Sequence, residues 1–327
     1  MSKRRTLGLT AMLLTVAMAV AACGQAAAPT AAPADAPTPA PATSMTVAMI
    51  THEVPGDTYW DIIRAGAQDA AASLGVNLKY SNDPDFTKQA VLVQNAIDSK
   101  VDGIAMTAAG PDALIGAVQS ANAAKIPVVM FDSGIEDWQR MGAMMYFGSD
   151  EYIAGKALGK QIADSGGKHV LCVIHQEGST ALEARCKGVK DGGANTENMQ
   201  VNGADDASVK ASVAAKLQQD PSIDYIVAMG APLALVILQS LDVAGSKAKV
   251  ATFDLNLDAA NAVKEGKITM AVDAQPYLQG YLAVASLYLY KTNGDIIGGG
   301  QAVLTGPAIV DASNIDVILP FAKNGTR

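Results

Sequence analysis

The sequence predicts an α/β protein with two doubly wound domains and mostly parallel sheets. Short apolar runs alternate with amphipathic helical stretches over residues 45–327, and this alternation with short connections is typical of parallel sheets covered by helices on both faces. The same stretch is long for one hydrophobic core and sufficient for two. Polar and aromatic residues follow the expected strands, at the sheet edge where such folds bind ligands.

The expected elements run in order from residue 46. The run 46–51 is apolar, as expected for a strand buried on both faces. After a loop with Pro, Gly and Asp at 55–57, apolar residues recur at helical spacing over 60–74, and Gly75 ends the helix. Further strands are expected at 76–81, 101–107, 126–132, 144–148, 168–175, 223–230, 248–254 and 268–273, with helices at 86–99, 111–124, 152–165, 208–219, 232–244 and 277–291.

The side chains at the expected strand ends share one chemical character. They are the aromatics Tyr59, Trp60 and Phe253, the carboxylates Asp57, Asp132 and Asp254, the small polar Thr107 and Ser149, and the guanidinium of Arg185. Aromatic rings stack on the C–H faces of sugars. Carboxylates and guanidinium groups form charge-assisted hydrogen bonds with hydroxyls. This lining favours a small sugar as the ligand.

The chain resembles the ribose/galactose type of periplasmic sugar-binding proteins, the substrate-binding lipoproteins of ABC importers, over roughly residues 46–320. The order and spacing of several short segments carry the resemblance. They are THEVPGDTYW (51–60), VDGI (101–104), IPVVMFD (126–132), FGSD (147–150) with AG (154–155), GSTALEAR (178–185) with Gly188, ATFD (251–254) and QPYLQG (275–280).

The resemblance implies two similar lobes joined by a three-stranded hinge, with the sugar between them. One lobe comprises 45–149 with 275–306, and the other comprises 150–274 with 307–327. Asp132 and Arg185 then grip hydroxyls from opposite lobes, and Ser149 lies beside the hinge. The implied ligand-binding residues are Asp57, Tyr59, Trp60, Thr107, Asp132, Ser149, Arg185, Gly230, Phe253, Asp254 and Gln275.

Two positions depart from the pattern of ribose-binding proteins. Gly230 stands where an Asn is usual, and Ala274 stands where a Gln is usual, with Gln275 next to it. Both changes enlarge the pocket and remove hydrogen bonds. The identity of the ligand therefore stays open between a hexose, a polyol and another small molecule.

Several of these residues also have a purely structural interpretation. Asp132 and Asp254 could cap helices, because Asp is a favoured N-cap residue. Tyr59 and Trp60 open a helix and could belong to the core. Arg185 could form a surface ion pair.

The first 22 residues predict a secretory signal peptide. They combine a basic start at 3–5, an apolar core at 7–20 and small residues before Cys23, and the core is shorter than the roughly 20 residues that span a bilayer. The segment Val-Ala-Ala-Cys at 20–23 resembles a bacterial lipobox, in which the cysteine is acylated. An ordinary signal that is cleaved nearby is the alternative. Residues 23–44 are rich in Ala and Pro and are expected to form a tether, which places the protein outside the cytoplasm and anchored to a membrane.

The charge balance is acidic. The chain has 24 basic and 32 acidic side chains, and three of the basic ones lie in the expected signal peptide. No block of Lys or Arg follows, which argues against nucleic acid as a partner and against a polybasic membrane patch.

Cys172 and Cys186 are the two cysteines that remain if Cys23 is lipidated. An even pair outside the cytoplasm suggests a disulfide. Cys172 lies in an expected strand and Cys186 in the helix that follows, so the two could meet where that helix packs on its sheet. Two buried free thiols are the alternative.

No cofactor or metal is expected. His52, His169 and His175 are not spaced with carboxylates or thiols as metal ligands are. Asp254, with acidic or amide residues at 256, 258 and 265, imitates a calcium loop, but its sixth position is Ala259 and not the Gly that the turn needs.

These observations predict a monomeric solute-binding lipoprotein that delivers a monosaccharide or polyol to the membrane permease of an ABC importer. Presentation of the sugar to a membrane sensor is one alternative. A secreted hydrolase on the same fold is another, but the sequence lacks a Gly-x-Ser-x-Gly elbow, so no enzyme is expected. A DNA-binding repressor is discarded because an export signal stands where its DNA-reading domain would be.

Overall fold

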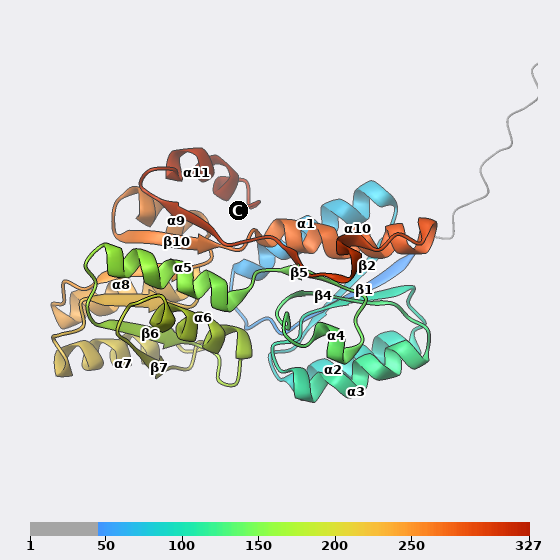
Figure 1. The fold of residues 1–327 in the computed structure, drawn as a ribbon, viewed down its shortest axis with the longest axis horizontal. Coiled ribbons are helices and arrows are strands. Elements are labelled where there is room, and N and C mark those ends of the chain that lie inside the picture. The colour runs from blue at the N-terminus through green and yellow to red at the C-terminus, as the bar shows by residue number, and fades with distance from the viewer. Residues whose placement is uncertain (1–44) are drawn as a thin grey trace, which may run out of the picture. The chain divides into compact units, whose positions relative to one another are not determined.

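Two six-stranded sheets flanked by helices make up residues 45–327, the part of the chain that the computed structural model describes (Figure 1). The expected signal peptide (1–22), the lipidation site Cys23 and the tether (23–44) lie outside the described residues. Within 45–327 no helix combines the length and the apolar character needed to cross a bilayer.

The first sheet is entirely parallel and has the strand order β11-β5-β4-β3-β1-β2. Its strands are β1 (Thr46–Thr51), β2 (Asn77–Asn82), β3 (Gly103–Met106), β4 (Val128–Asp132), β5 (Met145–Gly148) and β11 (Val303–Leu304). Its helices are α1 (Tyr59–Leu74), α2 (Phe86–Asp98), α3 (Pro111–Ala123), α4 (Trp138–Met141) and α10 (Pro276–Asn293), which is followed by the short 3₁₀ turn Ile297–Gly300. Helices α1 and α10 cover one face, and α2 and α3 cover the other.

The second sheet has the order β12-β10-β9-β8-β6-β7, with β12 antiparallel to β10 and the other pairs parallel. Its strands are β6 (Val170–Ile174), β7 (Thr196–Gln200), β8 (Tyr225–Ala228), β9 (Lys249–Phe253), β10 (Ile268–Asp273) and β12 (Ala308–Asp311). Its helices are α5 (Glu151–Asp164), α6 (Thr180–Asp191), α7 (Asp206–Gln219), α8 (Ala231–Ala244), α9 (Leu257–Lys264) and α11 (Ile315–Lys323).

The predicted α/β fold with two doubly wound sheets is confirmed. Central strands such as β4 and β8 are buried along their whole length, because helices cover both faces of a parallel sheet. Sequence reasoning did not find the edge strands β7, β11 and β12 or the terminal helix α11.

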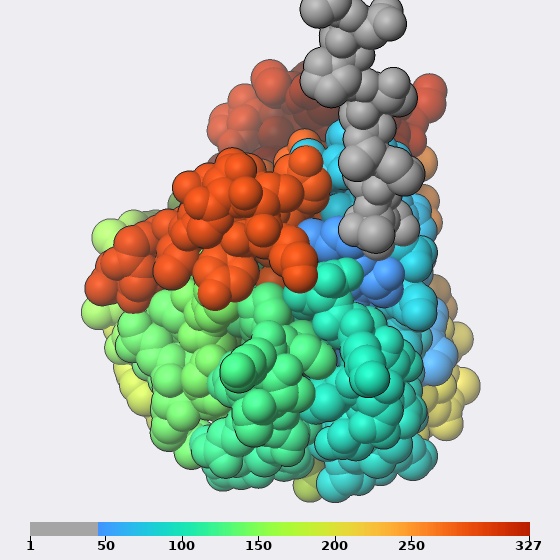
Figure 2. Space-filling model, turned by 90° about the vertical axis from the view of Figure 1, so that its right-hand side faces the viewer, coloured from blue at the N-terminus to red at the C-terminus, as the bar shows by residue number. Residues whose placement is uncertain are grey.

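The described chain passes between the two sheets three times, at 149–150, 274–275 and 305–307. After the second passage α10 returns to the first sheet and packs along α1. Gly66 and Gly280 permit this contact, because a Cβ at Gly66 would stand 2.0 Å from the carbonyl oxygen of Tyr277, and one at Gly280 would stand 2.1 Å from that of Ile63. Figure 2 shows α10, coloured orange, lying against the blue to green elements of the first sheet.

Candidate ligand-binding site

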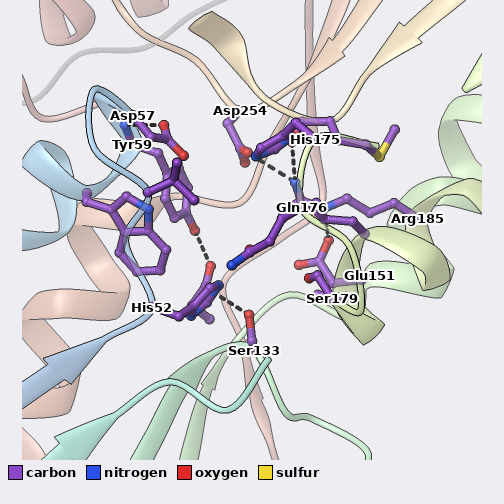
Figure 3. A pocket seen from close by; sticks show the side chains of 16 residues that line it. His52, Asp57, Tyr59, Ser133, Glu151, His175, Gln176, Ser179, Arg185 and Asp254 are labelled. Carbon is purple, nitrogen blue, oxygen red and sulfur yellow. Dashed lines mark hydrogen bonds and ion pairs between the residues drawn. The ribbon is translucent and has the colours of Figure 1, made fainter. Parts of the chain in front are cut away.

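A hollow lies between the carboxyl ends of the strands of the two sheets, with about 450 Å³ of atom-free space that includes its opening to solvent (Figure 3). The loops after β1 and β4 line it from one side, and the loops after β6, β8 and β9, together with α5 and α6, line it from the other. Its lining residues are His52, Val54, Asp57, Tyr59, Trp60, Asp132, Ser133, Glu151, His175, Gln176, Ser179, Ala181, Leu182, Arg185, Met229 and Asp254.

On the side of the first sheet, the carboxylate of Asp132 is held by two side-chain hydrogen bonds. It ends β4 in the left-handed conformation, with φ 63°. The hydroxyl of Tyr59 donates to its Oδ1 at 2.7 Å, and the hydroxyl of Ser133 donates to its Oδ2 at 2.6 Å. These two bonds fix the orientation of the carboxylate, and each of its oxygens keeps a further lone pair for a ligand.

His52 and Trp60 form the neighbouring wall. Their rings meet edge to face with centroids 4.9 Å apart. The Nδ1 of His52 lies 2.7 Å from Oγ1 of Thr107, which also accepts from the side-chain amide of Gln89. Burial lowers the pKa of His52 to about 4, so its imidazole is neutral near pH 7. Thr107 is not among the lining residues of the hollow. Its contact with Nδ1 orients the His52 ring instead.

Arg185 lies at the centre of a buried ion network on the side of the second sheet. Its Nε donates to Glu151, and its Nη1 donates to Asp254 and to the carbonyl oxygen of Met229, both at 3.1 Å. The guanidinium carbon lies 4.6 Å from the centroid of the Phe253 ring. Nε and Nη1 of Arg185 are thus bonded within the protein. Phe253 and Glu151 both contact Arg185, and they affect the site by holding its guanidinium in place.

Two carboxyl groups of the lining, Asp57 and Asp254, are protonated more readily than usual. Burial raises the pKa of Asp254 to about 8, and the nearby carboxylates of Glu151, Asp57 and Asp132 act in the same direction. Burial likewise raises the pKa of Asp57 to about 6, although the N–H of Tyr59 donates to its Oδ1 at 3.1 Å and opposes the shift.

Three buried polar atoms of the lining have no hydrogen-bond partner among residues 45–327. They are Oδ1 of Asp254, Nδ1 of His175 and Oγ of Ser179. A buried polar atom without a partner costs about 1–3 kcal/mol. Together they present a carboxyl oxygen, a ring nitrogen and a hydroxyl to whatever enters the hollow.

The structure brings together six of the residues that the sequence singles out, namely Asp57, Tyr59, Trp60, Asp132, Arg185 and Asp254. Ser149 and Gln275 lie at passages between the sheets. The side-chain amide of Gln275 donates to the carbonyl oxygen of Thr305, and its Oε1 accepts from Arg327 at 2.7 Å.

Gly230 lines a neighbouring hollow of about 880 Å³, which shares Val54, Asp57 and His175 with the first. A Cβ at Gly230 would stand 3.5 Å from Cε1 of His175. The imidazole of His175 therefore borders the space that a side chain at Gly230 would use.

The capping interpretation of Asp254 is wrong. Asn256 caps α9 instead, because its Oδ1 accepts from the N–H of Ala259 at 2.8 Å. The same helix occupies the stretch that imitates a calcium loop.

Sequence reasoning missed six polar or charged members of the lining. These are His52, Ser133, Glu151, His175, Gln176 and Ser179. His52, His175 and Gln176 directly follow β1 and β6, within the strand ends where the rule places a ligand, but they were not chosen as site residues. Glu151 had no such signal, because its role depends on its contact with Arg185.

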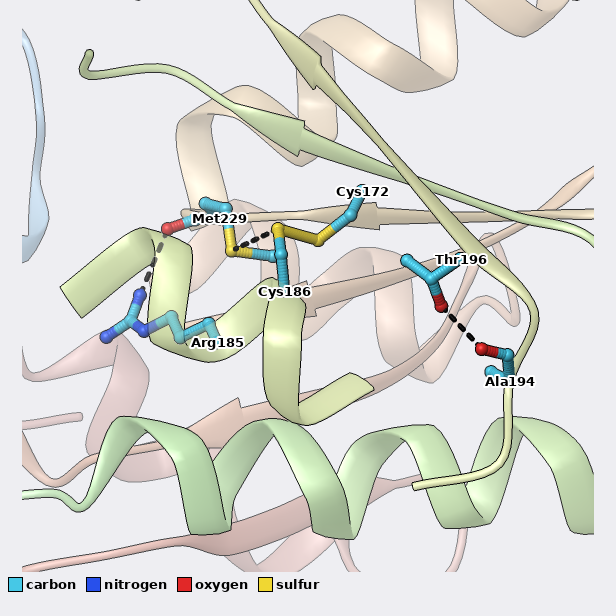
Figure 4. The surroundings of a disulfide bond; sticks show 6 residues. All are labelled: Cys172, Arg185, Cys186, Ala194, Thr196 and Met229. Carbon is cyan, nitrogen blue, oxygen red and sulfur yellow. Dashed lines mark hydrogen bonds between the residues drawn. A yellow bond between two sulfur atoms is a disulfide. The ribbon is translucent and has the colours of Figure 1, made fainter. Parts of the chain in front are cut away.

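The expected disulfide joins Cys172 in β6 to Cys186 in α6 (Figure 4). The two cysteines are 14 positions apart, and their Cα atoms lie 5.9 Å apart. The bond fastens α6 to its sheet one residue after Arg185. It therefore helps to hold the guanidinium at the hollow.

One cluster of possible metal ligands lies away from the hollow. His169, Glu197 and Asp220 come together near the amino end of β6, although their spacing in the sequence did not indicate this. The ammonium of Lys216 lies 2.9 and 3.0 Å from the two carboxylate oxygens of Glu197. A cation of the protein already compensates that carboxylate.

Two α/β units with one polar hollow between their strand ends define the class of two-lobed solute-binding proteins. The chain belongs to the periplasmic binding protein domain family, whose profile matches residues 47–295. The resemblance to type I periplasmic sugar-binding proteins is confirmed. Members of this family bind solutes outside the cytoplasm and are not enzymes.

Several characterised proteins are similar to this chain. The xylose/arabinose-binding protein of Sulfolobus acidocaldarius is 24% identical over 78% of this chain and 68% of its own length. The ribose import binding protein of Bacillus subtilis is 30% identical over 61% of this chain and 66% of its own. A carbohydrate transporter from Acidothermus cellulolyticus 11B, solved in complex with myo-inositol, has a TM-score of 0.86 and 54% identity, covering 87% of this chain and 100% of that one.

Proposed function

We propose that the protein is a lipid-anchored solute-binding protein that closes two lobes around one monosaccharide or polyol and delivers it to an ABC importer. The lobes comprise 45–149 with 275–306, and 150–274 with 307–327. Cys23 provides the anchor, and the permease of the importer is the membrane partner.

The observation that carries this proposal is the supply of buried hydrogen-bonding groups from both sheets around one hollow. Asp132 offers an oriented carboxylate from the first sheet. Asp254 and Ser179 offer oxygens from the second that have no hydrogen-bond partner within 45–327. Trp60 adds an aromatic ring in the same lining. A small molecule with several hydroxyls satisfies such groups, because each hydroxyl both donates and accepts.

A cyclic polyol is the first ligand to test. The relative with 54% identity was crystallised with myo-inositol. Its sequence is much closer to this chain than those of the ribose- and xylose-binding relatives. Neither Gly230 nor Ala274 supplies the side-chain amide expected of a ribose site.

Thermal unfolding of the purified protein with myo-inositol, ribose, xylose, glucose and galactose tests the proposal. A ligand that binds only the folded state stabilises it by about 4 kcal/mol at a thousand times its dissociation constant. We expect at least one of these ligands to raise the melting temperature in the wild type and far less in Asp132→Asn. If no polyol does so, the proposed ligand class is wrong.

The anchor is tested separately in cells. Cys23→Ala should abolish lipidation and release a soluble or uncleaved form. If this variant is processed and retained on the membrane like the wild type, Cys23 is not the lipidation site.

A further inference from the structure

Asp57 and Asp254 face each other across the hollow from opposite sheets (Figure 3). Asp57 lies in the loop before α1, and Asp254 directly follows β9. Asp254 is 5% exposed, and its Oδ1 has no partner among the described residues. Asp57 accepts one backbone hydrogen bond, from the N–H of Tyr59.

The lining of the hollow contains more negative than positive groups. Among residues 45–327, four carboxyl groups line it, and Arg185 is the one guanidinium or ammonium group in the same lining. Arg185 is bound to Glu151 and to Oδ2 of Asp254. The groups that bond Asp132 are the neutral hydroxyls of Tyr59 and Ser133. Among residues 45–327, Asp57 is therefore left without a positive partner, and Asp254 shares the guanidinium of Arg185 with Glu151.

The two histidines of the lining do not correct this imbalance. Burial lowers the pKa of both His52 and His175 to about 4, so both rings are neutral near pH 7. Like charges in a poorly solvated site repel strongly. The excess of carboxyl groups therefore favours the uptake of a cation or a proton from outside the described chain.

We propose that the site prefers polyols that carry one ammonium group, such as an amino-substituted cyclitol or hexose, with this group placed between Asp57 and Asp254. This inference rests on the proposed function and adds the charge of the ligand to it. The ammonium supplies up to three N–H donors and no acceptor. The hydroxyls of the ligand contact Asp132, and on the side of the second sheet they contact the atoms that have no partner among the described residues, as in the neutral parent.

A neutral polyol does not compensate the negative charge of the lining. Asp57 and Asp254 have pKa values raised to about 6 and about 8, so closure around a neutral ligand near pH 7 should take up a proton from solution. A cationic ligand supplies the charge itself. The number of protons taken up on binding therefore distinguishes the two classes independently of affinity.

Titration calorimetry of the full chain at pH 7, in two buffers of different ionisation enthalpy, tests the inference. The probes are myo-inositol with an amino-deoxy-inositol, and glucose with glucosamine and N-acetylglucosamine. We expect the amine to bind at least tenfold more tightly than its neutral parent and to take up fewer protons. N-acetylglucosamine, which keeps a nitrogen substituent without the charge, should lose the gain.

Two variants locate the effect. Asp57→Asn should reduce the preference for the amine over its neutral parent to less than threefold, whatever the change in affinity for the parent. Glu53→Gln is the matched control, because Glu53 lies four residues earlier, bonds Arg64 and Tyr80, and does not line the hollow. This control should keep the full preference.

The outcomes separate the two proposals. Tight binding of a neutral parent with an equal or weaker affinity for its amine overturns this inference and leaves the proposed function intact. An N-acetyl derivative that binds as well as the amine also overturns it. If none of the probes binds, the proposed ligand class fails, and this inference fails with it.

Discussion

Asp132 and Asp254 share the left-handed backbone conformation, each with φ 63°. They stand at the carboxyl ends of β4 and β9, which are third from the same end of their sheets in the order β11-β5-β4 and β12-β10-β9. Asp and Asn tolerate this conformation better than other residues with a Cβ. Each sheet thus uses an equivalent turn to direct one carboxylate into the hollow.

Because Asn also tolerates this conformation, two substitutions distinguish the contact of Asp132 with the ligand from its effect on the backbone. We expect Asp132→Asn to weaken ligand binding about 10- to 100-fold, because a hydrogen bond to a charged group contributes about 1.5–3 kcal/mol. Its stability should stay close to that of the wild type. Asp132→Ala should bind as weakly and also lose about 1–2 kcal/mol, because Ala is strained at this φ. Calorimetry and urea unfolding measure both effects, and wild-type affinity in Asp132→Asn would mean that this carboxylate does not touch the ligand.

Arg185 should be essential for stability as well as for binding. Arg185→Ala leaves Glu151 and Asp254 buried without their cation, which typically destabilises a protein by about 3–5 kcal/mol. Arg140→Ala is the control, because this exposed arginine pairs with Asp112 and Asp137 at the surface, where solvent screens ion pairs, and its loss should destabilise the protein far less. Urea unfolding at pH 7 compares the two. Equal losses in both variants would show that the buried network is not stabilising.

The parts of the fold that sequence reasoning found are those that follow from burial. The run 128–131 is apolar because helices cover both faces of β4, and this pattern is visible without a structure. Strand β7 reads Thr-Glu-Asn-Met-Gln and lies at the edge of its sheet. Thr196 is buried, and of the residues after it only Glu197 and Met199 are partly covered. Its composition does not distinguish it from a loop.

The same difference applies to the site. Asp132 and Asp254 were predictable because parallel strands end at one edge of a sheet. The pairing of Arg185 with Glu151 was not, because it depends on how α5 and α6 pack, and the two residues are 34 positions apart. Thr107 was predicted to bind the ligand, whereas it contacts His52. The order of the strand ends does not show which of two neighbouring side chains lies closer to the hollow.

Acid should weaken the folded state through His52. Burial lowers its pKa from 6.5 to about 4, so the unfolded chain binds a proton in this range and the folded protein does not. The contribution of His52 is therefore fully present above pH 6.5 and is lost as the pH falls towards 4, by on the order of 3 kcal/mol. The raised pKa values of Asp57 and Asp254 act in the opposite sense.

Comparison with His52→Gln isolates this effect, because the other titrating groups are common to both proteins. The difference in the free energy of unfolding between wild type and variant should shrink between pH 7 and pH 4.5. Urea unfolding at several pH values provides the measurement. Parallel pH profiles would show that His52 is protonated as easily in the folded protein as in the unfolded chain.

Closure of the two lobes should depend on a small number of hydrogen bonds between loops of the two sheets. Nδ2 of Asn256 donates to Oγ1 of Thr58 at 2.9 Å. Thr180 donates through its backbone N–H and its hydroxyl to the carbonyl oxygen of Ala109, at 3.3 and 3.2 Å. If the ligand leaves through an open form, these bonds break first. Their loss should therefore accelerate ligand release with little change in the rate of association.

Thr58→Val removes the first of these bonds at nearly constant volume and leaves Asn256 able to cap α9. We expect the ligand to dissociate about 3- to 10-fold faster, because a neutral hydrogen bond contributes about 0.5–1.5 kcal/mol. Thr292→Val is the matched control, since the hydroxyl of Thr292 bonds within α10, to the carbonyl oxygen of Tyr288. Stopped-flow fluorescence gives the rates, and small-angle scattering should show a smaller radius of gyration with saturating ligand. An unchanged radius on tight binding, or equal dissociation rates in the two variants, would point to a rigid pocket in place of a closing one.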